Sequence, residues 1–169
     1  MNYQKLIETN HYQMIVNNWV TSLSVVPPWS LMTRQDRTNY LRYLISELLD
    51  KSIIYILFDI TRKKDKAVGW VVFQIIDELP VIHYMYIKHQ YRGQGLGSNL
   101  LSILLPRHFH LGIDPIYASF PGPFLYPISG EDNVQVRYRG RVDKYNIKVR
   151  PFLAKDIIDN RLPQDWSST

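Results

Sequence analysis

The sequence predicts an α/β protein in which two helices precede a small, mostly antiparallel sheet. Two segments near the N-terminus repeat apolar residues at helical spacing, and three segments rich in β-branched and aromatic residues follow them. Links of about six and four residues join these three segments. A parallel crossover needs a dozen or more residues, so the three strands must form an antiparallel meander.

Both helices are expected before the first strand. In the first helix, apolar residues recur at helical spacing over Tyr12–Leu23. The segment Pro27–Trp29 then ends the helix and predicts a stiff aromatic loop. Thr33 and Asp36 form a capping pair at the start of the second helix. The apolar stripe of that second helix consists of Tyr40, Leu41, Leu44, Ile45, Leu48 and Leu49.

The strands of the meander are expected at Ile53–Ile60, Ala67–Ile76 and Val81–Lys88. A helix over Ser98–Leu105 follows, because Pro106 disfavours its continuation, and Ile116–Ser119 is expected to be a short buried strand. The later part of the chain predicts an irregular segment followed by a hairpin. Three prolines make Phe120–Ile128 irregular, and the two strands of the hairpin are expected at Val134–Val142 and Tyr145–Arg150.

Length and composition suit one domain over residues 1–169, with an atypical part from about residue 120. The chain has no cysteine, which excludes disulfides, thiolate zinc sites and a cysteine nucleophile, and we expect no metal site. The net charge of +5 is compatible with an anionic ligand or nucleic acid and proves neither. No apolar run is long enough to cross a membrane, and residues 1–10 lack a secretion signal. We therefore expect a cytoplasmic protein, and the sequence leaves open whether it is a monomer or a homodimer.

The strongest functional signal is a strand, a glycine-rich turn over Arg92–Gly97 and a helix, in that order. Glycines let backbone N–H groups approach a ligand, and the N-terminus of the helix adds unpaired N–H groups and a positive dipole end. This arrangement predicts a phosphate or pyrophosphate site, against the alternative of a turn without a ligand. The G-x-G-x-G spacing after a meander argues against a Rossmann site, and the absence of a following Lys-Ser or Lys-Thr excludes a P-loop.

The segment Tyr86–Gly97 resembles motif A of the GNAT (Gcn5-related N-acetyltransferase) superfamily, whose consensus is met by Arg92, Gly95 and Gly97. The order of the expected elements is also similar to that of the family, over residues 5 to 120. In addition, Asn17–Leu23 and Val81–Lys88 resemble a group of GNAT-like proteins encoded by bacteriophages. The resemblance implies an α/β GNAT fold, a mixed and mostly antiparallel sheet with helices on both faces.

The resemblance further implies an acetyl-CoA-dependent N-acetyltransferase. Such an enzyme would acetylate an amine of a protein or small molecule by direct transfer in a ternary complex, without a covalent enzyme intermediate. In such proteins the strand before the loop separates from the next strand, and pantetheine pairs with its exposed backbone, here that of Met85, Tyr86 and Ile87. Backbone N–H groups of the loop would hold the pyrophosphate, and its residues are Arg92, Gly93, Gln94, Gly95, Leu96, Gly97 and Ser98.

The catalytic groups are less well marked. Many family members place a carboxylate at the start of the strand before the loop, but Val81 stands near that position here. His83 lies two residues further on, is expected on the same face and titrates near neutral pH, so it is a candidate for proton transfer or substrate contact. The alternative is a core histidine satisfied by a hydrogen bond. Tyr84 is expected on the opposite face, as a weaker candidate for contact with the acceptor or as a packing residue.

After residue 120 the sequence departs from the family pattern. The helix that carries a general-acid tyrosine in many relatives is missing, and Tyr126 is the nearest phenol, with Tyr117 as a second candidate. The alternative is that both tyrosines only pack. This departure keeps open a catalytically degenerate GNAT protein that binds CoA, or nothing, and works through protein contacts.

Two further surfaces are candidates for contact with the acceptor or a partner. The loop that carries Trp29 would line the acceptor site, unless Trp29 tucks it onto the core. Arg137, Arg139 and Arg141 alternate and could share one strand face that contacts nucleic acid or an acidic protein, the alternative being an exposed hairpin. A GNAT scaffold that modifies nucleic acid is therefore a third hypothesis.

Overall fold

The computed structural model describes the side chains of part of the chain, all of them between residues 10 and 119. The structure describes residues 2–5, 9–25, 29–61, 66–76, 78–105, 110, 114, 116–119, 125–127, 133–138, 141–142 and 147–149.

The helices are α1 (Thr9–Leu23), α2 (Arg34–Lys51) and α3 (Leu96–Leu104), with short 3₁₀ turns η1 (Trp29–Leu31) and η2 (His89–Tyr91). The first five strands are β1 (Asn2–Lys5), β2 (Ile53–Asp59), β3 (Lys66–Ile76), β4 (Leu79–Ile87) and β5 (Ile116–Ala118). The remaining strands are β6 (Leu125–Pro127), β7 (Asn133–Tyr138), β8 (Arg141–Val142) and β9 (Ile147–Val149).

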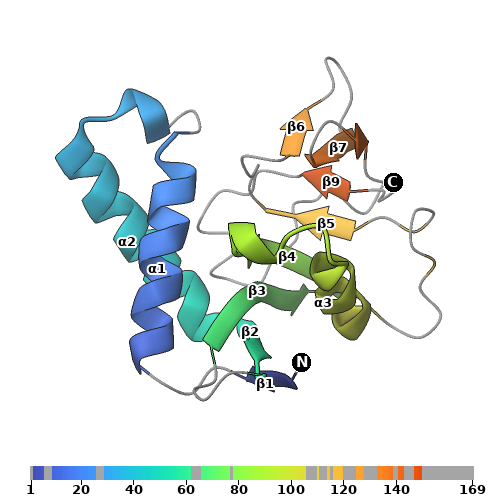
Figure 1. Ribbon diagram of the computed structural model, residues 1–169. Helices are drawn as coiled ribbons and strands as arrows, with labels where there is room; N and C mark the ends of the chain where they lie inside the picture. Colours follow the sequence, from blue (N-terminus) through green and yellow to red (C-terminus); the bar gives the residue numbers. More distant parts are fainter. Residues whose placement is uncertain are drawn as a thin grey trace.

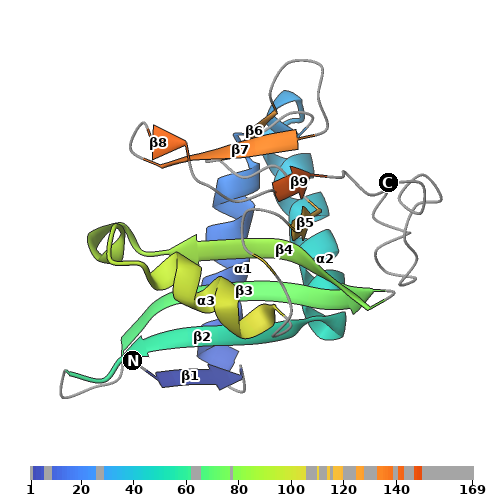
Figure 2. The same ribbon diagram turned by 90° about the vertical axis from the view of Figure 1, so that its right-hand side faces the viewer.

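The strands of the described residues join in the order β1-β2-β3-β4-β5-β9-β7-β6, and β8 pairs with β7 outside this path. The pairs β4–β5 and β5–β9 are parallel, and the other pairs are antiparallel. Figure 2 shows this succession, with β1 at one edge and β7 and β6 at the other. The predicted meander β2-β3-β4 is confirmed, and so is the mixed, mostly antiparallel sheet.

Helices cover both faces of the sheet, as the fold class predicted. Figure 1 shows α1 and α2 as one layer on one face and α3 on the other, and Figure 2 agrees. Two buried clusters lie in these two layers. The cluster between the sheet and α1 and α2, here the α1/α2 cluster, includes Trp19, Leu48 and Trp70. The cluster between the sheet and α3 includes Leu57 and Leu100.

The start of α2 depends on the predicted capping pair. The side-chain oxygen of Thr33 accepts a hydrogen bond from the backbone N–H of Asp36, at 3.2 Å. The Thr33 hydroxyl in turn donates to Oδ2 of Asp36, at 2.7 Å. These bonds satisfy an N–H group that has no partner within the helix and place a carboxylate at the positive end of the helix dipole.

Two expectations about the chain ends were wrong, and a third was confirmed only in part. No strand was expected near the N-terminus, but β1 pairs with β2 along the edge of the sheet. The segment expected to be irregular contains β6, which pairs with β7. The final hairpin is confirmed only in its antiparallel pairing of β7 with β9, because the strand expected over Val134–Val142 is split into β7 and β8, which pair with each other, and β9 also pairs with β5. Arg137 and Arg141 therefore lie on two antiparallel strands and not on one, and Arg139 lies outside the described residues.

Candidate active site

The glycine-rich turn joins β4 to α3 through η2. Gly93 and Gly95 have φ angles of 80° and 77°, in the left-handed region that side chains with a Cβ rarely adopt. Gly95 is the N-cap of α3, and its carbonyl accepts the first helical bond, from the N–H of Asn99 at 3.0 Å. The N–H groups of Leu96 and Gly97 therefore have no acceptor within the helix. The turn thus presents backbone donors and the positive end of α3 to one side of the loop.

The space beside this turn is open. A Cβ built on Gly95 would meet no atom within 4 Å, and one on Gly97 would meet only Cε of Met85, at 3.9 Å. Leu96 is buried among the side chains under α3, so only its backbone remains for a ligand. This open space next to the helix N-terminus is compatible with the phosphate site that the glycine spacing predicts.

The side chain of Arg92 lies beside the turn, held by two contacts. Nε of Arg92 donates a hydrogen bond to the carbonyl of Ile87, at 2.7 Å. The guanidinium carbon lies 5.3 Å from the centroid of the Tyr86 ring, within the range of a cation–π contact. Lys88 lies at the same end of β4, and its pKa is lowered first by burial and then by Lys66. The end of β4 that faces the turn is therefore positively charged.

Strand β4 is longer than its pairing with β5. The two strands pair only at Val81 with Tyr117 and at Ile82 with Ala118, and the N–H of Ser119 then donates to the carbonyl of Ile82 at 2.9 Å. The β4 segment 83–87 continues beyond this point while its other edge stays paired with β3. Within the described residues, β4 therefore has an edge of about five residues without a strand partner, and this edge leads directly to the glycine turn.

The strand register changes at the point where β4 and β5 separate. Val72 of β3 pairs with Tyr84, and the next residue, Phe73, pairs with Ile82, so the β4 strand contains an extra residue at His83. Because of this β-bulge, Tyr84 packs in the same α1/α2 cluster as Val81. The prediction that Tyr84 faces the opposite side was therefore wrong, since simple alternation along β4 does not hold across the bulge.

The family of this chain is shown by comparison with known proteins. A model of the acetyltransferase (GNAT) family matches residues 19–121, more than half of the sequence. The chain belongs to the acetyltransferase (GNAT) family. The match spans α1 to β5 and so includes the glycine turn and the separation of β4 from β5. A search among curated proteins found no match.

Several solved structures are similar at low identity. A protein of Staphylococcus aureus subsp. aureus assigned to the GNAT acetyltransferases is 20% identical, with a TM-score of 0.48, covering 62% of this chain and 88% of that one. A protein of Pyrococcus furiosus assigned as an acetyl transferase is 15% identical, with a TM-score of 0.46, covering 61% and 72%. The ribosomal-protein-alanine N-acetyltransferase of Brucella melitensis biovar Abortus 2308 is 16% identical, with a TM-score of 0.40, covering 62% and 68%. The family assignment rests on the family model.

His83 occupies a closed position in this GNAT fold. Its side chain is 3% exposed, and its ring nitrogens lie 2.8 Å from Oγ of Ser119 and 2.8 Å from Oε1 of Gln74. Burial lowers the pKa of His83 from 6.5 to about 3, so the ring is neutral at physiological pH. The burial and the two hydrogen bonds favour the second interpretation from the sequence, in which His83 is a core histidine satisfied by hydrogen bonds.

Tyr84 joins an aromatic stack on the α1 side of the sheet. Its ring lies parallel to that of Trp19, with the centroids 5.0 Å apart, and 6.4 Å from the ring of Tyr86. The Tyr84 hydroxyl donates to Oδ1 of Asn18 and lies 2.9 Å from Oγ of Ser22. Burial raises the pKa of Tyr84, more than the bond to Ser22 lowers it, so the phenol stays protonated. Packing thus accounts for this side chain.

The other predicted site residues are spread over the fold. Trp29 is partly buried against the α1/α2 cluster, as in the alternative where it tucks the loop onto the core. Tyr117 is buried in the same cluster, which favours packing over proton transfer. Tyr126 lies in β6, opposite Gln135, and its side chain lies outside the described ones.

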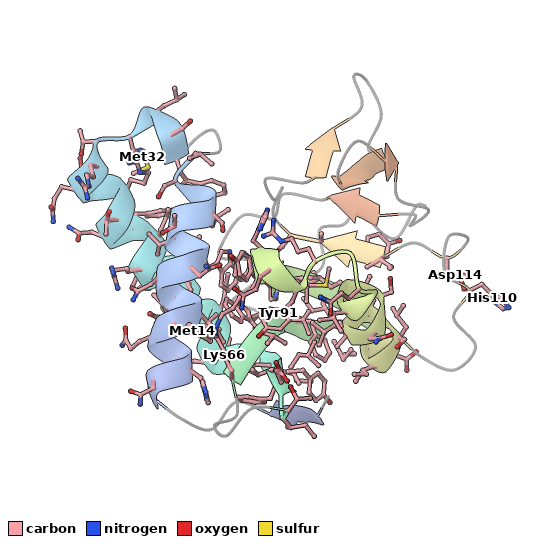
Figure 3. All side chains as sticks on the ribbon, viewed as in Figure 1. Met14, Met32, Lys66, Tyr91, His110 and Asp114 are labelled. Atoms are coloured by element: carbon pink, nitrogen blue, oxygen red, sulfur yellow. The ribbon has the colours of Figure 1, made fainter. Side chains whose placement is uncertain are left out.

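Two side chains that carry titratable groups lie away from the site. Nδ1 of His110 lies 3.5 Å from a carboxylate oxygen of Asp114 on the segment after α3. Figure 3 shows both residues at the edge of the molecule that is farthest from α1 and α2, whereas Tyr91 lies centrally.

Within the described residues, no helix has the length and apolar character needed to cross a membrane.

Proposed function

We propose that this GNAT protein is an acetyl-CoA-dependent N-acetyltransferase that transfers the acetyl group directly to an amine. The observation that carries the proposal is the unpaired edge of β4, which runs into an open glycine turn at the N-terminus of α3. The unpaired edge of β4 fits an extended chain that carries amides, and the glycine turn fits a pyrophosphate. A dinucleotide or nucleoside triphosphate would need a different loop and strand order.

This geometry supports the predicted cofactor-binding residues. The backbone N–H groups of the turn over residues 92–98 would bind the pyrophosphate, and Arg92 would add a cation already oriented by Ile87 and Tyr86. The unpaired backbone of Met85, Tyr86 and Ile87 would pair with the pantetheine amides. When bound, acetyl-CoA supplies an activated acetyl thioester, so the chain itself needs no nucleophile. A backbone N–H of the unpaired β4 edge would donate to the oxygen that becomes negative during transfer.

The roles of individual side chains in the reaction are proposals of the same kind. We assign His83 a positioning role, because both of its ring nitrogens already have partners and burial keeps the ring neutral. Tyr126 remains the predicted general acid for the CoA thiolate. Trp29 is partly exposed and would line the acceptor side, whereas Tyr84 is buried, so its predicted contact with the acceptor has less support.

Broader expectations also stay predictions of the sequence. They are the bacteriophage origin, the host cytoplasm as the location, the monomeric or homodimeric state and the contact of the basic C-terminal segment with nucleic acid or an acidic protein. The acceptor is an amine of a protein or a small molecule. Release of free thiol from acetyl-CoA in the presence of candidate amines would identify it.

Calorimetric titration with acetyl-CoA and with CoA tests the proposal. The wild type is expected to bind both ligands. Gly95→Val is expected to lose binding, because its side chain would enter the open space beside the turn and because valine at a φ of 77° would strain the turn. Glu78→Val is the matched control, because Glu78 also has a positive φ, of 66°, but lies in the turn at the other end of β4. If the wild type binds neither ligand, the catalytically degenerate alternative replaces the proposal. If Gly95→Val binds normally, the turn is not the pyrophosphate site.

A further inference from the structure

A chain of buried polar side chains crosses three strands at the junction of β4 and β5. It runs from Ser119, after β5, through His83 of β4 to Gln74 of β3. The exposed fractions of these side chains are 0%, 3% and 4%. Polar groups are costly to bury without partners, so a fully bonded chain at this depth holds its members in one arrangement.

The direction of each hydrogen bond follows from the far end of the chain. Nε2 of Gln74 donates to the carbonyl of Lys51 at the end of α2, at 3.2 Å, so the Gln74 oxygen faces His83. Nε2 of His83 must then carry the proton and donate to Gln74. Nδ1 of the neutral ring is left as an acceptor, and the Ser119 hydroxyl donates to it. The ring is therefore fixed in orientation and tautomer from both sides.

This chain lies at the point where β4 and β5 separate. The last bond between the two strands runs from the N–H of Ser119 to the carbonyl of Ile82, and His83 is the extra residue of the bulge that follows. Ser119 thus bonds to β4 twice, once through its backbone and once through its side chain. Together these bonds close the space between the strands and fix where the unpaired edge of β4 begins.

We propose that His83 is a positioning residue whose bond to Ser119 closes the space between β4 and β5 and restricts the thioester to a short acyl group. This inference rests on the proposed function. A ligand whose pyrophosphate binds at the turn after β4 and whose pantetheine follows residues 87 to 85 extends its acyl end toward His83. There the side chains of His83 and Ser119 are 3% and 0% exposed and lie 2.8 Å apart, so no methylene group can enter between them. An acyl chain longer than acetyl must displace them.

Calorimetric titration with CoA, acetyl-CoA and butyryl-CoA tests this inference without an acceptor. The wild type is expected to bind butyryl-CoA at least about tenfold more weakly than acetyl-CoA. Ser119→Ala removes the hydroxyl that holds the His83 ring. It is expected to reduce the ratio of the dissociation constants of butyryl-CoA and acetyl-CoA several-fold. His83→Asn shortens the side chain at the same junction and is expected to act in the same direction. Binding of CoA itself should stay unchanged in both variants, because CoA has no acyl group at the junction.

Gln74→Leu is the matched control, because it breaks the other 2.8 Å bond of the same ring on the β3 side, away from the junction. It should reduce stability as Ser119→Ala does, yet change the acyl preference less, because the bond between Ser119 and His83 still closes the junction. Equal binding of acetyl-CoA and butyryl-CoA by the wild type would overturn the inference. An unchanged ratio in the junction variants, or an equal change in Gln74→Leu, would also overturn it. Failure of the wild type to bind any of the three ligands would instead refute the proposed function.

Discussion

Lowering the pH should destabilise the protein through one buried side chain, His83. In the unfolded chain His83 has a pKa of 6.5, whereas burial lowers the pKa of His83 in the folded protein to about 3. Between these two values the unfolded state holds a proton that the native state lacks. Protonation therefore favours unfolding, and the free energy of unfolding falls as the pH falls from 6.5 toward 3.

The size of this effect follows from the two pKa values. Each pH unit inside the interval removes about 1.4 kcal/mol of stability, because one proton separates the two states. From about pH 7.5 to about pH 5, His83 alone should account for a loss of about 2 kcal/mol. That is a large part of the stability of a typical domain, which is about 5–15 kcal/mol.

Urea denaturation of the wild type and of His83→Gln at both pH values measures this contribution. Tryptophan fluorescence can follow unfolding, because the chain has 4 tryptophans. The variant cannot take up the proton, so its stability should fall by about 2 kcal/mol less than that of the wild type over this interval. His89→Gln, at an exposed position, should behave as the wild type.

Parallel pH profiles for wild type and His83→Gln would refute this reasoning. A second measurement covers the case in which the variant does not fold. In the wild type, the ring resonances of His83 should not titrate between about pH 5 and 8. Titration in that range would show that the ring is open to water.

Three other substitutions follow from local geometry, each measured by urea denaturation. Gly69→Ala should lose about 1–3 kcal/mol, because the new Cβ would lie 2.9 Å from the carbonyl oxygen of Tyr86, and an unchanged stability would contradict the close approach of β3 and β4. Glu78→Gly should gain about 0.5–1 kcal/mol by relieving the positive φ of 66°, whereas a loss would mean that the side chain has another role. Tyr84→Phe should lose about 1 kcal/mol, because it removes the bonds of the hydroxyl to Asn18 and Ser22, and calorimetric titration should show unchanged CoA affinity, whereas lost affinity would place the hydroxyl at the ligand.

Much of the architecture could be predicted because it depends on local patterns. The short links between β2, β3 and β4 leave no room for a crossover, so the antiparallel meander followed from spacing alone. The Thr33 cap is a contact between residues three apart. The glycine turn depends on φ angles that glycine favours, which is why the spacing of Gly93 and Gly95 in the sequence was enough to predict the turn.

The parts that could not be predicted depend on residues far apart in the chain. The face of Tyr84 is set by a bulge opposite β3, which no alternation within β4 reveals. Strand β9 inserts between β5 and β7, a choice among distant partners that the apolar pattern of a three-residue strand cannot make. The sequence could offer only two interpretations of His83, a proton carrier or a core residue.

The sequence by itself determined the types of the elements from α1 to β5, the meander and the glycine turn, because periodicity, capping and glycine conformation act over a few residues. Only the tertiary structure decided which strands lie side by side and which polar groups meet. His83 faces Ser119, 36 residues away, and Gln74, nine residues away, and these contacts exist only when three strands are in register. The chemistry available to a side chain is set by the solvent and the partners that the fold leaves to it, and burial at the β4–β5 junction makes His83 a neutral, bonded residue.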